Sequence, residues 1–168
     1  MITFFTTTKD FIGEFKTIQN NALSSWRSLS NLVEIIILGE SYGAKKAAEN
    51  FKAKFISNIA LSRYSTPKVS DLFNMAEKYS NNNLLCYLNA DIIVPENFLD
   101  VIKLLKGING KFLGVGYRWD LYVDKLIDFN NPHLKRKFWE YAYNFSKKHP
   151  CTGIDYFIYK KSTFNDIP

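Results

Sequence analysis

Asn89 and Asp91 are the residues whose types and spacing most directly indicate chemistry. They stand two positions apart after the apolar run of residues 84–88, so both side chains can face one cavity across the turn that follows a buried strand. Hard divalent cations bind side-chain oxygens of this kind. A bound cation would neutralise a diphosphate and stabilise the charge that develops as the diphosphate leaves. Asn and Asp also cap turns and helix starts, so a purely structural role is the alternative.

Other polar side chains follow predicted strands in the same way. In open α/β sheets, ligands bind beyond the carboxyl ends of the strands, so polar residues at those ends are candidates for a site. Besides Asn89 and Asp91, these candidates are Thr6, Thr7, Thr8, Glu40, Arg118 and Asp120. The sequence has neither G-x-G-x-x-G after its first predicted strand nor G-x-x-x-x-G-K-[ST] anywhere, which disfavours dinucleotide oxidoreductases and P-loop nucleotidases.

The elements that must position these residues alternate between strands and helices. Nearly continuous apolar runs at 33–38 and 84–88 predict strands covered on both faces. Shorter β-branched or aromatic runs predict strands at 2–5, 55–56, 112–117 and 154–159. Apolar residues at steps of three and four predict helices at 15–29, 44–51, 69–79, 95–105 and 132–145. This order predicts an α/β fold, a three-layer α/β/α sandwich with a mainly parallel central sheet.

Several expectations concern single positions in these elements. Gln19 and Arg27 fall on the polar face of the first helix and are expected to be solvated. Ser70 and Asp71 are suited to capping the N–H groups at the start of the third helix. Gly114 and Gly116, in the predicted strand 112–117, mark places where another group can approach the backbone closely.

Composition limits the class of protein and its partners. A chain of 168 residues is close to the roughly 150 expected of one domain. A net charge of +6 favours an anionic partner such as a nucleic acid, a membrane surface or a phosphorylated small molecule. Cys86 and Cys151 are too few for a disulfide framework, which favours a reducing compartment. With no run of about 18 apolar residues and no signal-peptide pattern, we expect a soluble, cytoplasmic protein whose membrane contact is at most peripheral.

The order of these motifs resembles the GT-A fold of glycosyltransferases, in which an Asp-x-Asp motif binds a metal and the diphosphate of a nucleotide sugar. The similar segments span almost the whole chain: residues 2–7, 33–40, 66–73, Cys-Tyr-Leu-Asn-Ala-Asp-Ile at 86–92, Gly-Tyr-Arg-Trp-Asp at 116–120 and Gly-Ile-Asp-Tyr-Phe at 153–157. Each segment is short, and their order is the more specific signal. The resemblance implies a single GT-A-like (Rossmann-like) domain over residues 1–168 that is short or truncated at its C-terminus.

The resemblance also implies roles for individual residues. Asn89 and Asp91 would bind Mn²⁺ or Mg²⁺, although the family's first Asp is replaced here by Asn89, which removes one negative charge. The residues implied in nucleotide binding are Thr6, Thr7, Thr8, Glu40 and Asp71. Their structural alternatives are β propensity for the threonines, a solvated turn for Glu40 and a helix cap for Asp71.

Two carboxylates are candidates for proton transfer from an acceptor hydroxyl. Asp155 lies in a predicted strand, where an isolated carboxylate is unusual, and would act as general base if desolvated. Asp120 is the rival, with Arg118 and Trp119 shaping an acceptor pocket because an aromatic face stacks on the C–H face of a sugar. The structural alternatives are a salt-bridged edge residue for Asp155 and an ion pair between Arg118 and Asp120.

These observations lead us to expect a metal-assisted glycosyltransferase. It would transfer a sugar from a nucleotide-diphosphate donor to an unassigned glycan, lipid-linked or protein acceptor. One alternative is an inactive nucleotide-sugar-binding module of the same fold. Another is a basic nucleic-acid-binding domain, but the basic residues form no single stripe with interleaved aromatics, so no nucleic-acid partner is expected. The basic residues within 135–148 are a candidate contact with an anionic membrane.

Overall fold

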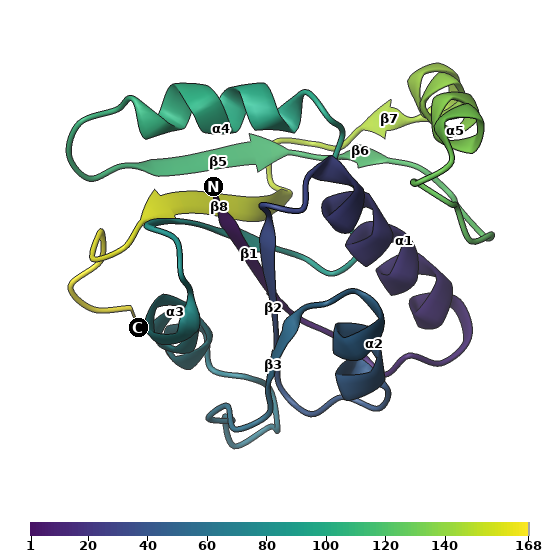
Figure 1. The fold of residues 1–168 in the computed structure, drawn as a ribbon. Coiled ribbons are helices and arrows are strands. Elements are labelled where there is room, and N and C mark those ends of the chain that lie inside the picture. The colour runs from purple at the N-terminus through teal and green to yellow at the C-terminus, as the bar shows by residue number, and fades with distance from the viewer. Residues whose placement is uncertain (168) are drawn as a thin grey trace.

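The computed structural model describes residues 1–167, and the strands of its central sheet alternate with helices in the order that the sequence predicts (Figure 1). The central six-stranded sheet is formed by β1 (Thr3–Thr7), β2 (Glu34–Leu38), β3 (Lys54–Ile56), β4 (Leu84–Leu88), β5 (Leu113–Tyr117) and β8 (Ile154–Lys160). A separate antiparallel pair is formed by β6 (Trp119–Asp120) and β7 (Lys147–Lys148). The helices are α1 (Gly13–Leu29), α2 (Ala44–Asn50), α3 (Val69–Tyr79), α4 (Phe98–Lys106) and α5 (Pro132–Phe145).

The sheet has the strand order β3-β2-β1-β4-β8-β5. Strands β1 to β4 pair in parallel, whereas β8 is antiparallel to both β4 and β5, so β5 runs in the same direction as β4. The predicted mainly parallel sheet is therefore confirmed. Because the last strand in the chain lies between β4 and β5, its first residues lie beside the carboxyl ends of both neighbours. Tyr156 of β8 is in register with Leu88 of β4 and with Gly116 of β5.

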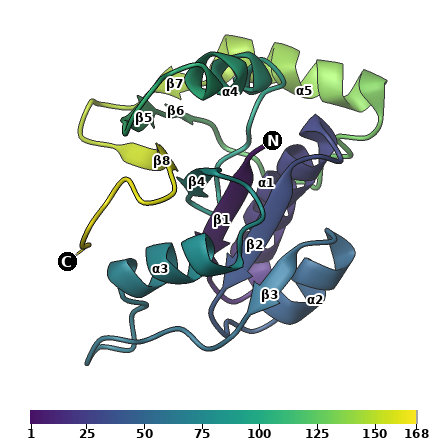
Figure 2. The same ribbon diagram turned by 60° about the vertical axis from the view of Figure 1, so that its left-hand side comes forward.

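Helices cover both faces of the sheet, which confirms the predicted three layers (Figure 2). Successive side chains of a strand point to opposite faces. Phe4 of β1 therefore packs edge-on against Trp26 of α1, with ring centroids 5.8 Å apart, in the core beneath α1, α2 and α4. Phe5 packs edge-on against Phe73 of α3, at 5.1 Å, in the core on the other face. Among residues 1–167, no helix combines the length and the apolar character that a membrane span requires.

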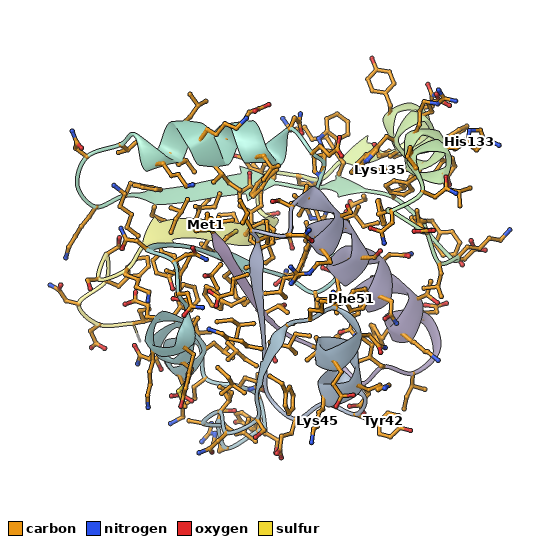
Figure 3. The ribbon with its side chains drawn as sticks, viewed as in Figure 1. Met1, Tyr42, Lys45, Phe51, His133 and Lys135 are labelled. Carbon is orange, nitrogen blue, oxygen red and sulfur yellow. The ribbon has the colours of Figure 1, made fainter. Side chains whose placement is uncertain are left out.

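Helix α5 lies away from the central sheet, beside β6 and β7 (Figure 1). Of its residues, all of which the structure describes, Phe138 alone is buried, and it packs edge-on against Phe129. Two of the side chains that Figure 3 labels, His133 and Lys135, belong to this helix, and Lys135 donates a hydrogen bond to Glu96 before α4. Asn131 caps the start of the helix by accepting from the N–H of His133 at 3.0 Å.

Some side chains that were expected to be solvated hold elements together instead. Gln19 is buried, and its side-chain amide forms two hydrogen bonds with the backbone of Lys9. The amide oxygen accepts from the Lys9 N–H at 2.7 Å, and the amide nitrogen donates to the Lys9 carbonyl at 3.0 Å. Arg27 is partly buried and donates to three backbone carbonyls, one of them that of Lys52 at 3.2 Å. Apolar periodicity places such residues on a polar face, but it does not report which backbone groups lie opposite.

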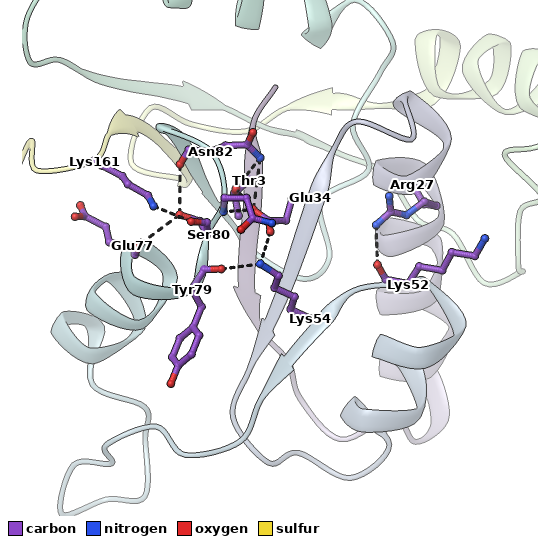
Figure 4. Close-up of polar contacts among 11 residues, drawn as sticks. Thr3, Arg27, Glu34, Lys52, Lys54, Glu77, Tyr79, Ser80, Asn82 and Lys161 are labelled. Atoms are coloured by element: carbon purple, nitrogen blue, oxygen red, sulfur yellow. Dashed lines mark hydrogen bonds and ion pairs between the residues drawn. The ribbon is translucent and has the colours of Figure 1, made fainter.

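The amino ends of the strands are joined by a polar cluster around Glu34 (Figure 4). Its carboxylate pairs with the Lys54 ammonium at 2.6 Å and accepts from the Thr3 hydroxyl at 2.5 Å. The backbone N–H of Asn81 donates to the same carboxylate at 2.8 Å. The cluster links β1, β2 and β3 to the segment before β4, at the edge of the sheet opposite the carboxyl ends.

Candidate active site

A cavity of about 1290 Å³ opens at the carboxyl ends of β4 and β5. Its inner wall includes Asn89 and Asp91 after β4 and Asp155 at the start of β8, and its outer wall includes the exposed rings of Trp119 and Tyr143. Pockets that hold one small molecule usually have volumes of about 300–1,000 Å³. This cavity therefore has room for two ligands, and the topology places it where ligands bind in open α/β sheets.

Arg118 is the centre of the polar contacts in this cavity. Its Nη1 atom donates to both carboxylate oxygens of Asp155, at 2.7 and 2.8 Å, and its Nε donates to Asp120 at 2.8 Å. The remaining nitrogen, Nη2, lies 3.2 Å from both ring nitrogens of His149. The ring of His149 in turn contacts Asp120, with 2.6 Å between Nδ1 and Oδ2. Both ion pairs given above as structural alternatives for Asp155 and Asp120 are therefore present.

The charges of this network stabilise one another. The hydrogen bonds that Arg118 donates to Asp120, and to a smaller extent those to Asp155, raise the pKa of the Arg118 guanidinium. Hydrogen bonds from Arg118 and then His149 lower the pKa of Asp120. Arg118 is therefore a cation paired with two carboxylates. These carboxylates neutralise most of the positive charge that Arg118 could offer to an anionic ligand.

Asn89 reaches the same network from the end of β4. Its Nδ2 atom donates to Asp155 Oδ1 at 2.8 Å, and its backbone N–H donates to the Asp155 carbonyl at 3.1 Å. No group among residues 1–167 donates to its Oδ1. Asn89 thus offers an amide oxygen to the cavity that it lines.

Asp91 is the carboxylate on this wall that remains accessible. Its side chain is exposed, while the walls of the cavity remove part of its solvation. This desolvation, together with the negative charge of Asp155, raises the pKa of Asp91, and the positive charges of Arg118 and Lys9 act in the opposite direction.

These donors fit a divalent cation that shares its coordination with a ligand. Among residues 1–167, no three His, Cys, Asp or Glu side chains gather as a complete metal site. Mg²⁺ and similar ions are commonly held by one or two carboxylates together with water and substrate phosphates. Asp91 supplies a free carboxylate and Asn89 an amide oxygen, whereas both oxygens of Asp155 are occupied by Arg118.

The residues implied in nucleotide binding do not line this cavity. Thr6 is fully buried and donates to the Thr7 carbonyl, so its hydroxyl is not accessible. Thr8 contacts Ser41 at 2.5 Å, and Glu40 is exposed after β2. These residues lie at the carboxyl edge of β1 and β2, beside the site.

Asp71 is used within the fold. The expected side-chain cap of α3 is absent, because neither Ser70 nor Asp71 is the N-cap residue; that position is Lys68, which makes no side-chain cap. Asp71 instead accepts from the backbone N–H of Ala60 at 2.6 Å and fixes the connection before the helix.

Sequence reasoning missed one feature of the site. The proline that follows His149 predicts a helix-boundary position for it, yet its ring contacts Arg118, which is 31 positions earlier in the chain. No local pattern signals a contact between segments so far apart. Of the close approaches predicted at Gly114 and Gly116, the one at Gly116 is present, because a Cβ atom there would lie 1.7 Å from the phenol oxygen of Tyr156. A Cβ atom at Gly114 would make only ordinary contacts, the nearest at 3.6 Å.

Comparisons with known proteins support the fold. No protein-family model and no curated protein matches the sequence. Among solved structures, the chain is similar to glucosyl-3-phosphoglycerate synthase from Mycobacterium tuberculosis, with a TM-score of 0.50 and 18% identity over 67% of this chain and 42% of that one. A second similar structure is a mycobacterial protein, with a TM-score of 0.50 and 20% identity over 67% of this chain and 39% of that one.

The chain spans about two fifths of the length of these two structures. At this level of identity the likeness concerns the fold. The chain has the fold of nucleotide-diphospho-sugar transferases of the GT-A type, as the order of its sequence motifs predicted.

Proposed function

We propose that this chain binds a nucleotide-diphosphate sugar together with a divalent cation and transfers the sugar to an acceptor. The observation that carries the proposal is the charge of the cavity. Among the described residues, its wall has one basic side chain, Arg118, against the acidic side chains of Glu14, Asp91, Asp120, Asp124 and Asp155. A diphosphate in such a cavity requires a compensating cation.

Asn89 and Asp91 are the residues that would hold Mn²⁺ or Mg²⁺ beside the diphosphate. When bound, the cation supplies charge stabilisation as the diphosphate leaves. The solved synthase from M. tuberculosis is in complex with Mn²⁺, uridine diphosphate and glucosyl-3-phosphoglycerate, which supports this class of donor and cofactor. Thr7, Thr8 and Glu40, at the same edge of the sheet, remain the candidates for contacts with the nucleotide.

The outer part of the cavity is proposed for the acceptor. Trp119 and Tyr143 are exposed there, and Asp120, which accepts from Arg118, lines the same cavity. Of the two predicted bases, Asp120 is the better placed to take the proton of an acceptor hydroxyl, since it is exposed and contacts His149. Both carboxylates already pair with Arg118, so the difference between them is exposure: Asp155 is buried. We also propose a cytoplasmic location, as expected from the low cysteine content; Cys86 and Cys151 are both free thiols.

A thermal-shift panel of UDP-, GDP- and dTDP-sugars with and without Mn²⁺ tests the proposal. We expect at least one donor to raise the melting temperature only when Mn²⁺ is present, and Asp91→Asn to remove this increase. Asp100→Asn is the matched control, because Asp100 is an exposed carboxylate on α4 paired with Lys103. Stabilisation without Mn²⁺, or an equal effect in Asp91→Asn, would contradict the proposed site.

Nucleotide release by the purified chain distinguishes transfer from binding alone. A transferase releases the nucleoside diphosphate slowly to water and faster when its acceptor is present. An inactive binding module of the same fold would show the Mn²⁺-dependent stabilisation and no release.

A further inference from the structure

Asn89 stands where the Asp-x-Asp motif of the GT-A fold has its first Asp. The contact between Asn89 and Asp155 gives a physical reason for this difference. We propose that Asp155 is a positioning residue: it holds the Asn89 amide with its oxygen toward the cavity, and its charge requires asparagine at position 89. This inference rests on the proposed function, because the oriented oxygen is a ligand for the proposed cation.

The orientation of the amide follows from the chemistry of its partner. Asp155 is 5% exposed, and its two carboxylate oxygens already accept from Arg118. An ionised carboxylate has no hydrogen to donate, so the atom of Asn89 that lies 2.8 Å from Asp155 Oδ1 must be the Nδ2 donor. The backbone hydrogen bond from Asn89 to the Asp155 carbonyl, at 3.1 Å, holds the two residues in register.

The same contact explains why aspartate would be unfavourable at position 89. A carboxylate there would place an oxygen against the buried carboxylate of Asp155, where the amide now donates. Two carboxylates in contact disfavour the doubly ionised state. Arg118 cannot offset the added charge fully, because it already pairs with Asp120 as well as Asp155.

A reciprocal exchange of the two residues tests the proposal. The variants are Asn89→Asp, Asp155→Asn and the double exchange, in which a donor and an acceptor again face each other. The readouts are the melting temperature without metal and the affinity for Mn²⁺ in the presence of UDP, measured by the loss of the free-Mn²⁺ paramagnetic resonance signal. Neither readout depends on catalytic activity.

We expect Asn89→Asp to lower the melting temperature without metal. We expect Asp155→Asn to weaken Mn²⁺ binding by about tenfold, the usual effect of removing a group that orients a ligand. The double exchange should regain most of both losses. Asn74→Asp is the matched control, since Asn74 is exposed on α3 and does not line the cavity, and we expect it to change neither readout appreciably.

The outcomes separate this inference from the function on which it rests. If the wild-type chain binds Mn²⁺ and Asn89→Asp binds it as tightly with an unchanged melting temperature, the positioning role is wrong and the site stands. A double exchange no better than the weaker single variant also overturns the positioning role. If the wild-type chain with UDP does not bind Mn²⁺, the proposed function itself fails.

Discussion

Arg118 is the residue on which the charge balance of the candidate site depends. It is the cation that pairs with Asp155, which is buried. Removing one member of a buried ion pair leaves an uncompensated charge and typically costs about 3–5 kcal/mol. Because Arg118 is partly exposed, we expect Arg118→Ala to lower the free energy of unfolding by about 3 kcal/mol, the lower end of that range, in urea titrations at neutral pH.

Two further variants control for the loss of a guanidinium. Arg136→Ala breaks an exposed pair with Glu140, 3.7 Å apart, and should change the free energy of unfolding by less than about 1 kcal/mol. Adding Asp155→Asn to Arg118→Ala should recover part of the loss, because the unpaired charge is then absent. Equal effects of Arg118→Ala and Arg136→Ala would show that leaving the buried Asp155 carboxylate without Arg118 does not destabilise the fold.

Glu34, at the opposite edge of the sheet, predicts how stability changes with pH. Burial by itself would raise the pKa of Glu34, but hydrogen bonds from Lys54, Thr3 and the Asn81 N–H lower it below the ordinary value of 4.5. The folded state therefore binds this proton less readily than the unfolded chain. The resulting stabilisation is complete above the ordinary value and is lost as the pH falls through the lower folded value.

Glu34→Gln should therefore lower the free energy of unfolding at neutral pH and make it less dependent on pH in the acid range. Urea titrations of both proteins from neutral pH to below 4.5 measure the difference between them. We expect the difference to narrow at the acid end. A difference that stays constant with pH would show that Glu34 acts through packing and not through its charge.

Among the elements, the pairing of β5 with β8 shapes the inner wall of the cavity. Gly116 of β5 faces Tyr156 of β8, and a Cβ atom would lie 1.7 Å from the phenol oxygen. The Tyr156 ring is held edge-on against Phe98 of α4, with centroids 5.7 Å apart, so it has little freedom to move aside. We expect Gly116→Ala to lower the free energy of unfolding by about 1–3 kcal/mol, measured by urea titration.

Gly114 provides the matched control on the same strand. A Cβ atom there would meet the Ile158 carbonyl oxygen at 3.6 Å, which is an ordinary contact. Gly114→Ala should therefore have a much smaller effect than Gly116→Ala. Adding Tyr156→Ala to Gly116→Ala should make the alanine at position 116 tolerable; if Gly116→Ala remains as costly in that background, the clash with the ring is not its cause.

The elements were largely predictable because each is encoded locally. Continuous apolar runs identify β2 and β4, and steps of three and four identify α1 and α3. The order of strands in the sheet is a different matter, since no local pattern places β8 between β4 and β5 or makes it antiparallel. That placement brings Asp155 to Asn89, so the candidate site was predicted as separate residues and not as one network.

Helix α5 illustrates the same limit. Its spacing predicts an apolar face that includes Leu134, Tyr141 and Phe145, yet these side chains are exposed and Phe138 is the buried member of the face. Periodicity indicates which residues share a face of a helix. Whether that face is covered depends on its neighbours, and α5 lies beside the short β6–β7 pair and not on the central sheet.

At the scale of the whole molecule, the chain is basic while its cavity is acidic. The net charge is +6, whereas acidic side chains outnumber basic ones on the wall of the cavity. Several cations are already engaged elsewhere: Lys54 pairs with Glu34, and Arg27 donates to backbone carbonyls. The surplus positive charge therefore lies outside the site. The net charge alone does not distinguish a nucleotide diphosphate bound in the cavity from an oligonucleotide bound on the basic surface, but this distribution of charge does.

This separation predicts opposite responses to salt. A nucleotide diphosphate bound through Mn²⁺ inside the cavity is shielded from bulk ions, so its stabilisation should change little between about 0.05 M and about 0.3 M NaCl. An oligonucleotide held by dispersed surface lysines should lose at least about tenfold in affinity over the same range. Competition between UDP and a random single-stranded oligonucleotide, followed by fluorescence anisotropy with Mn²⁺ present, measures both. Displacement of the oligonucleotide by UDP, with both affinities falling together as salt rises, would assign the cavity to nucleic acid and contradict the transferase site.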